Sequence, residues 1–122
     1  CAMSLPYQHA SIKAWSDEQH VQKNRIEYRE KFSTVKSILE PVLDVRMPDA
    51  GFYLWQKTPV SDKDFARGLY EQYHVTVLPG SYLSREINGF NPGDNHVRIA
   101  LVAPLDECIE AANRMKNFIE QC

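Results

Sequence analysis

The stretch at residues 75–105, VTVLPGSYLSREINGFNPGDNHVRIALVAPL, constrains the fold more than any other part of the chain. It begins and ends with runs of β-branched and aliphatic residues, and a loop rich in Gly, Asn, Pro and Ser separates them. Such runs favour β-strands, and such loops favour turns. The stretch therefore predicts strands at residues 75–78 and 97–102, joined by a long polar connection.

An arginine lies inside the second predicted strand. Because side chains alternate between the two faces of a strand, Arg98 faces away from Val97 and Ile99. A guanidinium stays charged at any ordinary pH, so it is seldom buried without a partner. Two interpretations stay open at this point: a salt bridge to an acid of the same domain, such as Glu86 or Asp94, or a receiver for the carboxylate of a ligand.

Helical signals occupy the first 40 residues. Pro6, two residues after Ser4, fits the first turn of a helix that runs to residue 15. Ser16 and Gln19 match a capping box for a second, longer helix, which Pro41 ends. That helix carries a seven-residue apolar repeat, formed by Val21, Tyr28, Val35 and Val42 with Phe32 and Leu39 between them. A coiled-coil contact is one interpretation, but a seam of about three heptads favours packing on its own domain.

The middle of the chain predicts two more strands. Residues 43–47 read as a short strand, and the sequence PDAG at residues 48–51 supplies a turn. The aromatic run at residues 52–55 is apolar on both faces, so we expect a strand that is covered on both sides.

Two further helices are expected. Ser61 and Asp64 match a capping box for a helix with an apolar stripe of Phe65, Leu69 and Tyr73. A last helix begins at Pro104, and its expected buried face comprises Leu105, Ile109, Ala112, Met115 and Ile119.

Together these elements predict an α/β fold, with a small mixed or antiparallel sheet of three to four strands, helices packed on it, and a long linking helix before it. We expect residues 1–40 to form linking helices and residues 41–122 to form one small C-terminal α/β domain. A chain of 122 residues is long enough for one such core.

Composition excludes several classes of function. A net charge of −2 leaves no basic footprint for nucleic acid or for a membrane surface. The three cysteines have no metal-binding spacing, so we expect no metal site and a reducing, cytoplasmic setting. Cys108 falls on the apolar side of the last helix and reads as an unreactive core thiol. His96 adjoins the strand of Arg98 and could lie near a site, but a strand-end surface histidine is the favoured interpretation.

Four stretches, taken in order, resemble the C-terminal part of the class I and II aminotransferases, the fold-type-I enzymes that use pyridoxal phosphate. They are SLPYQHA at residues 4–10, GFYLW at 51–55, VTVLPGS at 75–81 and VRIALV at 97–102. The longer segments PGSYLSRE and GFNPGDNHVRIALVAPLDEC resemble most the branch of N-succinyldiaminopimelate aminotransferases, which serves lysine and diaminopimelate synthesis.

This resemblance implies a role for four residues. Arg98 matches the arginine that clamps the substrate α-carboxylate with a two-pronged hydrogen bond, for which a planar guanidinium is suited. Gly51, Gly80 and Ser81 are implied to border the same cleft as the small domain closes on its substrate. The resemblance assigns substrate binding to Arg98 and no catalytic residue to this chain.

The resemblance also implies what lies outside this chain. The family's cofactor-linked lysine stands in a Ser-x-Ser-Lys-like motif, and no lysine here has that context. The family keeps the groups that hold the cofactor ring and phosphate in its large domain. The chain is therefore expected to be a fragment, inactive and without bound pyridoxal phosphate, of a homodimeric enzyme that uses the cofactor to move an amino group between an amino acid and a 2-oxo acid. Its expected partner is the missing large domain.

Two alternatives stay open on the sequence alone. The chain could be a free-standing α/β module that uses Arg98 to hold a small carboxylate without chemistry. It could instead belong to another fold-type-I pyridoxal-phosphate enzyme, a lyase or a synthase, which Arg98 does not distinguish from an aminotransferase.

Overall fold

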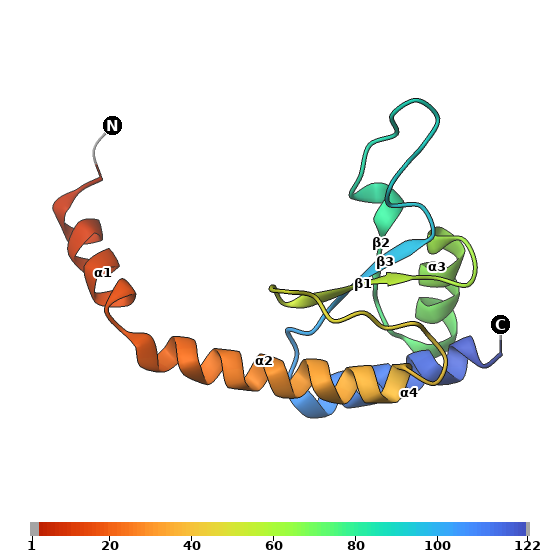
Figure 1. Cartoon of the computed structure of the whole chain (residues 1–122), viewed down its shortest axis with the longest axis horizontal. Helices are drawn as coiled ribbons and strands as arrows, with labels where there is room; N and C mark the ends of the chain where they lie inside the picture. Colours follow the sequence, from red (N-terminus) through yellow and green to blue (C-terminus); the bar gives the residue numbers. More distant parts are fainter. Residues whose placement is uncertain (1–2, 122) are drawn as a thin grey trace.

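The computed structural model describes residues 3–121 and contains four α-helices, three strands and one 3₁₀ helix, shown in Figure 1. In chain order these are α1 (Leu5–Trp15), α2 (Glu18–Leu39), β1 (Tyr53–Lys57), α3 (Asp62–Tyr73), β2 (Leu78–Pro79), η1 (Gly80–Tyr82), β3 (His96–Ala100) and α4 (Leu105–Ile119). The strands form one antiparallel sheet in the order β1-β3-β2. The expected α/β class with a small sheet of three to four strands is confirmed.

The central strand β3 gives the sheet two unlike faces. On one face Leu54, Val97 and Ile99 are buried in the core. On the other face Trp55 of β1 stands opposite Arg98 of β3, and Trp55 is 40% exposed. In an antiparallel pair, directly opposed residues share a face, so the register fixes which side chains meet on the open side.

The core forms where the long helices meet the inner face of the sheet. In Figure 1, α2 and α4 run side by side beneath the sheet, and α3 lies against β2 and β3. The largest fully buried side chains are Phe65, Leu39, Leu54, Leu69, Met115, Val35 and Val97. Residues from both sides of position 40 therefore share one core.

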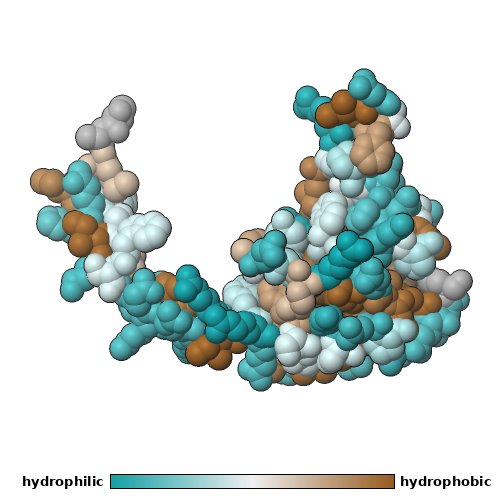
Figure 2. All heavy atoms as spheres, viewed as in Figure 1, coloured by the Kyte–Doolittle hydropathy of each residue, from teal (hydrophilic) through white to brown (hydrophobic). Residues whose placement is uncertain are grey.

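The apolar repeat of α2 does pack on the chain itself, but only along the second half of the helix. Phe32, Val35 and Leu39 are buried, whereas Val21 and Tyr28 are half-buried. The first half of α2 and all of α1 extend away from the body of the molecule in Figure 1, and α1 buries no residue. Figure 2 shows hydrophobic residues on the surface of α1. Leu5, Ile12 and Trp15 of this helix are all more than half exposed. No helix in residues 3–121 is long and apolar enough to cross a membrane.

The predicted capping boxes are wrong in detail. The cap of α2 is Asp17, not Ser16, and its carboxylate accepts a hydrogen bond of 3.1 Å from the amide of Gln19. Ser61 does precede α3, but its side chain makes no capping hydrogen bond. Several polar residues stand in a row at both helix starts, and the spacing rule cannot tell which one turns back onto the helix.

The strand predictions also need correction. Residues 43–47 lie in irregular structure, and the short strand β2 is Leu78–Pro79, not residues 75–78. The aromatic strand has shifted to Tyr53–Lys57, and only one of its faces is covered, since Tyr53 is 37% exposed. The last strand ends at Ala100, two residues before its predicted end.

The last helix begins at Leu105, one residue after the predicted start at Pro104, and its buried stripe is rotated. The buried residues are Cys108, Ala112, Met115 and Phe118, while Leu105, Ile109 and Ile119 are half-buried. Phe118 takes the place expected for Ile119 because its ring packs edge-on against Phe65 at 5.3 Å between centroids. In α3 the predicted stripe is correct: Phe65 and Leu69 are buried and Tyr73 packs against the core.

Leu39 and Ile26 offer a matched test of this core, because they lie on the same helix and only Leu39 is buried, at 0% exposure against 60% for Ile26. Replacing Leu39 with Ala should lower the free energy of unfolding by about 3 kcal/mol, since it leaves a cavity between α2 and α4. The same change at Ile26 should cost less than about 0.5 kcal/mol. Urea unfolding followed by circular dichroism measures both, and equal losses would show that α2 does not pack as described.

Candidate functional site

Arg98 lies at the centre of the sheet, flanked on both sides by other strands. It pairs with Trp55 of β1 on one side and with Leu78 of β2 on the other. Its neighbours Val97 and Ile99 point into the core, so the alternation predicted from the sequence holds. The guanidinium of Arg98 therefore projects from the open face of the sheet.

Arg98 has no acidic partner within residues 3–121. Its Nε atom is buried and makes no hydrogen bond, and no carboxylate of the described residues forms an ion pair with it, Glu86 and Asp94 included. The guanidinium carbon lies 5.6 Å from the centroid of the Tyr53 ring, within the range of a cation–π contact. An arginine held by an aromatic ring, with a donor unused, is ready to receive an anion.

Aromatic rings border Arg98 on the open face. The rings of Trp55 and His96 stack with an interplanar angle of 9° and a centroid distance of 5.7 Å. His96 is half-buried, and its Nδ1 atom lies 2.8 Å from the carbonyl oxygen of Asp94. His96 is thus fixed at the start of β3 and stands on the same face as Arg98, whereas the sequence favoured a strand-end surface histidine over a place near a site.

The turn at Gly80 and Ser81 lies directly beside this aromatic wall. A Cβ atom on Gly80 would lie 2.5 Å from the carbonyl oxygen of Gly93 and 2.8 Å from Cη2 of Trp55. Any side chain there would force the backbone segments apart, so glycine is required by close approach. The structure therefore brings the predicted Gly80–Ser81 turn to the same side of the sheet as Arg98.

Gly51 is not part of this turn region. It precedes β1 with φ of +106°, is exposed, and lines a hollow together with the first half of α2. The first residue of β1 pairs with Ala100, whereas Gly80 lies near His96, at the other end of β3. Gly51 and the Gly80–Ser81 turn thus stand at opposite ends of the strand that carries Arg98.

Asp62 is a buried acid beside the site, and no sequence pattern indicated its role. It is 4% exposed at the start of α3. Its Oδ2 atom accepts a hydrogen bond of 3.0 Å from the Ser81 amide, and Oδ1 accepts one of 3.4 Å from the Asn95 amide. Burial raises the pKa of Asp62, but hydrogen bonds from Ser81 and Asn95 outweigh burial and hold the pKa below its ordinary value. The capping pattern pointed to Asp64 instead, which is exposed.

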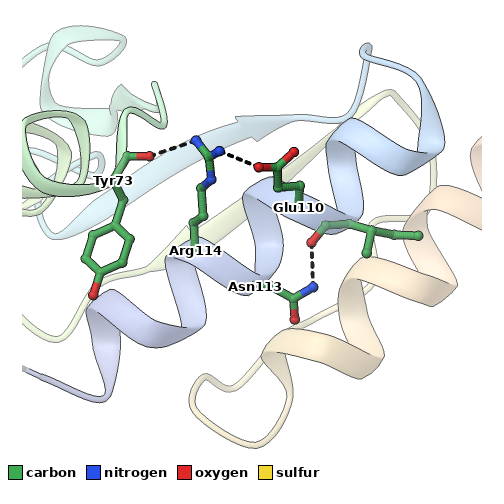
Figure 3. Close-up of polar contacts among 5 residues, drawn as sticks. Tyr73, Glu110, Asn113 and Arg114 are labelled. Carbon is green, nitrogen blue, oxygen red and sulfur yellow. Dashed lines mark hydrogen bonds and ion pairs between the residues drawn. The ribbon is translucent and has the colours of Figure 1, made fainter.

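A second hollow, of about 470 Å³, lies between α4, the segment 74–77 and the end of β3. Figure 3 shows its polar rim, where Arg114 donates to the carbonyl oxygen of Tyr73 at 3.2 Å and pairs with Glu110. The Cys108 thiol, which lines this hollow, is buried as predicted for a core thiol, and burial raises its pKa. Arg114 already has its partners, so this hollow offers no free cation comparable to Arg98.

The described lysines do not have the surroundings that a lysine bonded to pyridoxal phosphate needs. A lysine that bonds the cofactor must lie in a shielded pocket beside groups that hold the ring and the phosphate. None of the seven lysines, all within residues 3–121, is buried. The described residues also hold no cluster of His, Cys, Asp and Glu side chains that could bind a metal.

Comparison with known proteins identifies the family. Residues 1–115 match the model of aminotransferase class I and II. An aminotransferase from Neisseria meningitidis Z2491 is 50% identical over 95% of this chain and 30% of that chain, with a TM-score of 0.91. This chain belongs to the class I and II aminotransferases.

Two further relatives carry names related to diaminopimelate. A probable N-succinyldiaminopimelate aminotransferase from Thermus thermophilus is 36% identical, covers 84% of this chain and 27% of that chain, and has a TM-score of 0.70. The LL-diaminopimelate aminotransferase of Aquifex aeolicus is 34% identical over 105 residues, which are 83% of this chain and 25% of that relative. The chain thus spans about a quarter of the length of the curated relatives it matches.

The lowered pKa of Asp62 predicts an acid-dependent loss of stability. Between the lowered folded pKa and the ordinary value of 3.8, the unfolded chain binds a proton that the folded chain does not. Stability from Asp62 is therefore present above pH 3.8 and is lost as the pH falls through the folded pKa. Urea unfolding from about pH 5 to about pH 2.5 should show a shallower pH dependence for Asp62→Asn than for the wild type. Asp64→Asn, which removes an exposed acid from the same turn, should keep the wild-type slope; if Asp62→Asn keeps it too, the carboxylate is not held as described.

Proposed function

We propose that this chain supplies the substrate-carboxylate side of the active site of a pyridoxal-phosphate-dependent aminotransferase, with Arg98 as the residue that binds the α-carboxylate. The observation that carries this proposal is the state of Arg98. It is a permanent cation in the middle of a sheet, with a buried Nε atom that lacks a hydrogen-bond partner and no acid in the described residues to neutralise it. A buried donor left unpaired is costly, and a carboxylate ligand removes that cost.

The surroundings of Arg98 favour a planar anion over a round one. Tyr53 supports the guanidinium from one side, and the stacked Trp55 and His96 rings limit the space beside it. A fixed guanidinium presents a planar pair of N–H donors that matches the two oxygens of a carboxylate. The fit supports recognition of an amino acid or a 2-oxo acid, the two substrate classes of a transaminase.

We propose that the cofactor chemistry comes from outside the described residues, and the absence of a buried lysine among them supports this. When bound, this cofactor acts as an electron sink that makes amino-group transfer possible. We propose that the large domain of a longer enzyme provides the lysine and the phosphate contacts, and that residues 1–40 link it to the small domain of residues 41–122. We further propose that the parent is a cytoplasmic homodimer.

The amino acid that the parent uses is proposed from its relatives. Names related to diaminopimelate occur both among the curated relatives and among the solved structures. We propose N-succinyldiaminopimelate or a closely related diamino acid as the amino donor and a 2-oxo acid as the acceptor. Other relatives are named for aspartate and aromatic amino acids, so a substrate panel must include these.

Replacing Arg98 with Ala in the full-length enzyme tests the proposed role. Loss of a partly buried carboxylate contact should raise the KM for the amino acid about a hundredfold. Absorbance of the bound cofactor should stay unchanged, because Arg98 is not proposed to touch it. Arg98→Lys, which keeps the charge but loses the planar fork, should give a smaller rise.

Arg67→Ala serves as the control for the Arg98 variants, since Arg67 is an exposed arginine of α3. Its KM should equal that of the wild type. If Arg98→Ala also leaves KM unchanged, Arg98 does not bind the substrate.

Adding pyridoxal phosphate to the 122-residue chain alone tests the proposal that the large domain, and not this chain, binds the cofactor. We expect no absorption band from a cofactor linked to lysine, because every lysine here lies on an exposed or half-exposed position. Mass spectrometry after borohydride reduction measures the same outcome independently. A stable adduct at one specific lysine would show that this chain holds the cofactor itself.

A further inference from the structure

We propose that Asp62 is a positioning residue for Arg98, acting as a clasp that holds together the two ends of the loop between β2 and β3. This inference rests on the proposed function of Arg98 as the carboxylate receiver. Asp62 lies on α3 and is itself not proposed to touch the substrate. It is a buried acid for which the proposed reaction has no direct use.

The carboxylate joins the two ends of the loop that connects β2 to β3. The Ser81 amide, two residues after β2, donates to Oδ2 at 3.0 Å, and the Asn95 amide, one residue before β3, donates to Oδ1 at 3.4 Å. These two donors are 19 and 33 residues from Asp62 in the sequence. One side chain therefore contacts both ends of the loop. Figure 1 shows this loop leaving the sheet between β2 and β3.

The strand pair needs such a closure because β2 is very short. Only Leu78 and Pro79 pair with β3, opposite Arg98 and Val97. Pro79 has no amide hydrogen, so it cannot donate to the ladder. Two paired residues do little to fix the edge of a sheet, and a charge-assisted hydrogen bond to a carboxylate is stronger than a neutral one. The two hydrogen bonds of Asp62 therefore add to the weak strand pairing on the β2 side of Arg98.

Asp62 affects the position of Arg98 indirectly, through the Gly80–Ser81 turn that its carboxylate holds in place. With Ser81 fixed, Gly80 is pressed between the Gly93 carbonyl and the indole of Trp55, at distances that leave no room for a side chain. Trp55 is the residue opposite Arg98 on β1. A shift of the turn would release Trp55 and, with it, one wall beside the guanidinium.

A second set of hydrogen bonds keeps the loop ends together. The Asn91 side chain donates to the Ser81 carbonyl at 3.3 Å and accepts from the Gly93 amide at 2.9 Å. The Ser84 hydroxyl, with one hydrogen to donate, lies within hydrogen-bonding range of both the side-chain oxygen of Asn91 and the Gly80 carbonyl. These contacts lie within the loop, whereas Asp62 alone ties the loop to a helix among the hydrogen bonds described here.

The competing explanation is that Asp62 only stabilises the first turn of α3. Acidic side chains near a helix N-terminus do so through the helix dipole. Asp64 provides the matched control, because it is an exposed acid of the same turn. A helix-stabilising role predicts similar effects at both positions, and a clasp predicts an effect on the site at Asp62 alone.

The test uses the full-length enzyme with the variants Asp62→Asn and Asp64→Asn. For Asp62→Asn we expect the KM for the amino acid to rise about tenfold while kcat changes less than about threefold, since a misplaced Arg98 weakens binding of substrate and transition state alike. Asp64→Asn should leave both constants unchanged. Hydrogen exchange should also speed up at the Ser81 and Asn95 amides in Asp62→Asn only.

A double variant shows whether the effect passes through Arg98. In an Arg98→Ala enzyme, adding Asp62→Asn should raise KM no further. A second full tenfold rise would overturn the proposal, as would an unchanged KM in a folded Asp62→Asn enzyme. If Asp62→Asn does not fold, Asp62→Glu displaces the same two oxygens by one methylene and should raise KM with kcat retained; an unchanged KM there also overturns it.

These measurements distinguish a failure of the proposed role of Asp62 from a failure of the proposed function. If the wild type has no transaminase activity, or if Arg98→Ala leaves KM unchanged, the proposed function fails first. The amide exchange of Ser81 and Asn95 still decides whether Asp62 holds the loop ends, because that measurement needs no substrate. Unchanged exchange in Asp62→Asn would rule out the clasp itself.

Discussion

The pairing of β3 with a neighbour on each side is the constraint on which the rest of the small domain depends. One face of β3 places Val97 and Ile99 in the core, where helices α2, α3 and α4 meet. The same register forces Arg98 to the opposite face, beside Trp55. Burial on one side of a strand therefore determines the position of the charge on the other side, because the period of a strand is two residues.

The charge of a cation in this position can be balanced by an acid of the same chain or by an anion that binds from outside. The described residues supply no internal acid, and Tyr53 provides only an aromatic surface. The buried carboxylate of Asp62 is instead engaged by two backbone amides. Arg98 and Asp62 thus do not neutralise each other: the described acids leave Arg98 without an ion pair, and the carboxylate of Asp62 accepts from the backbone.

The sequence was sufficient for the fold class, for the order of the helices and for the face of Arg98, because periodicity and proline positions report these directly. It was not sufficient for residues 43–47 or for β2, since a short apolar run forms a strand only if a neighbour pairs with it. The role of Asp62 could not be predicted, because its two partners come from distant parts of the chain. Gly80 and Ser81 did fall beside the Arg98 face, while Gly51 lies at the far end of β3.

The close approach of Gly80 and Gly93 has a consequence for how sequences of this kind can diverge. A Cβ on either glycine would lie within 2.5 Å of a backbone atom of the other. The two glycines therefore fix the distance between the two backbone segments where the loop leaves the sheet and returns to it. Beyond these glycines the loop is largely exposed, with Ile87 and Phe90 at its tip 66% and 69% exposed. Insertions, deletions and new side chains can accumulate at this tip without moving the strand that carries Arg98, so the loop is the part of the domain where relatives can acquire different surfaces beside an unchanged sheet.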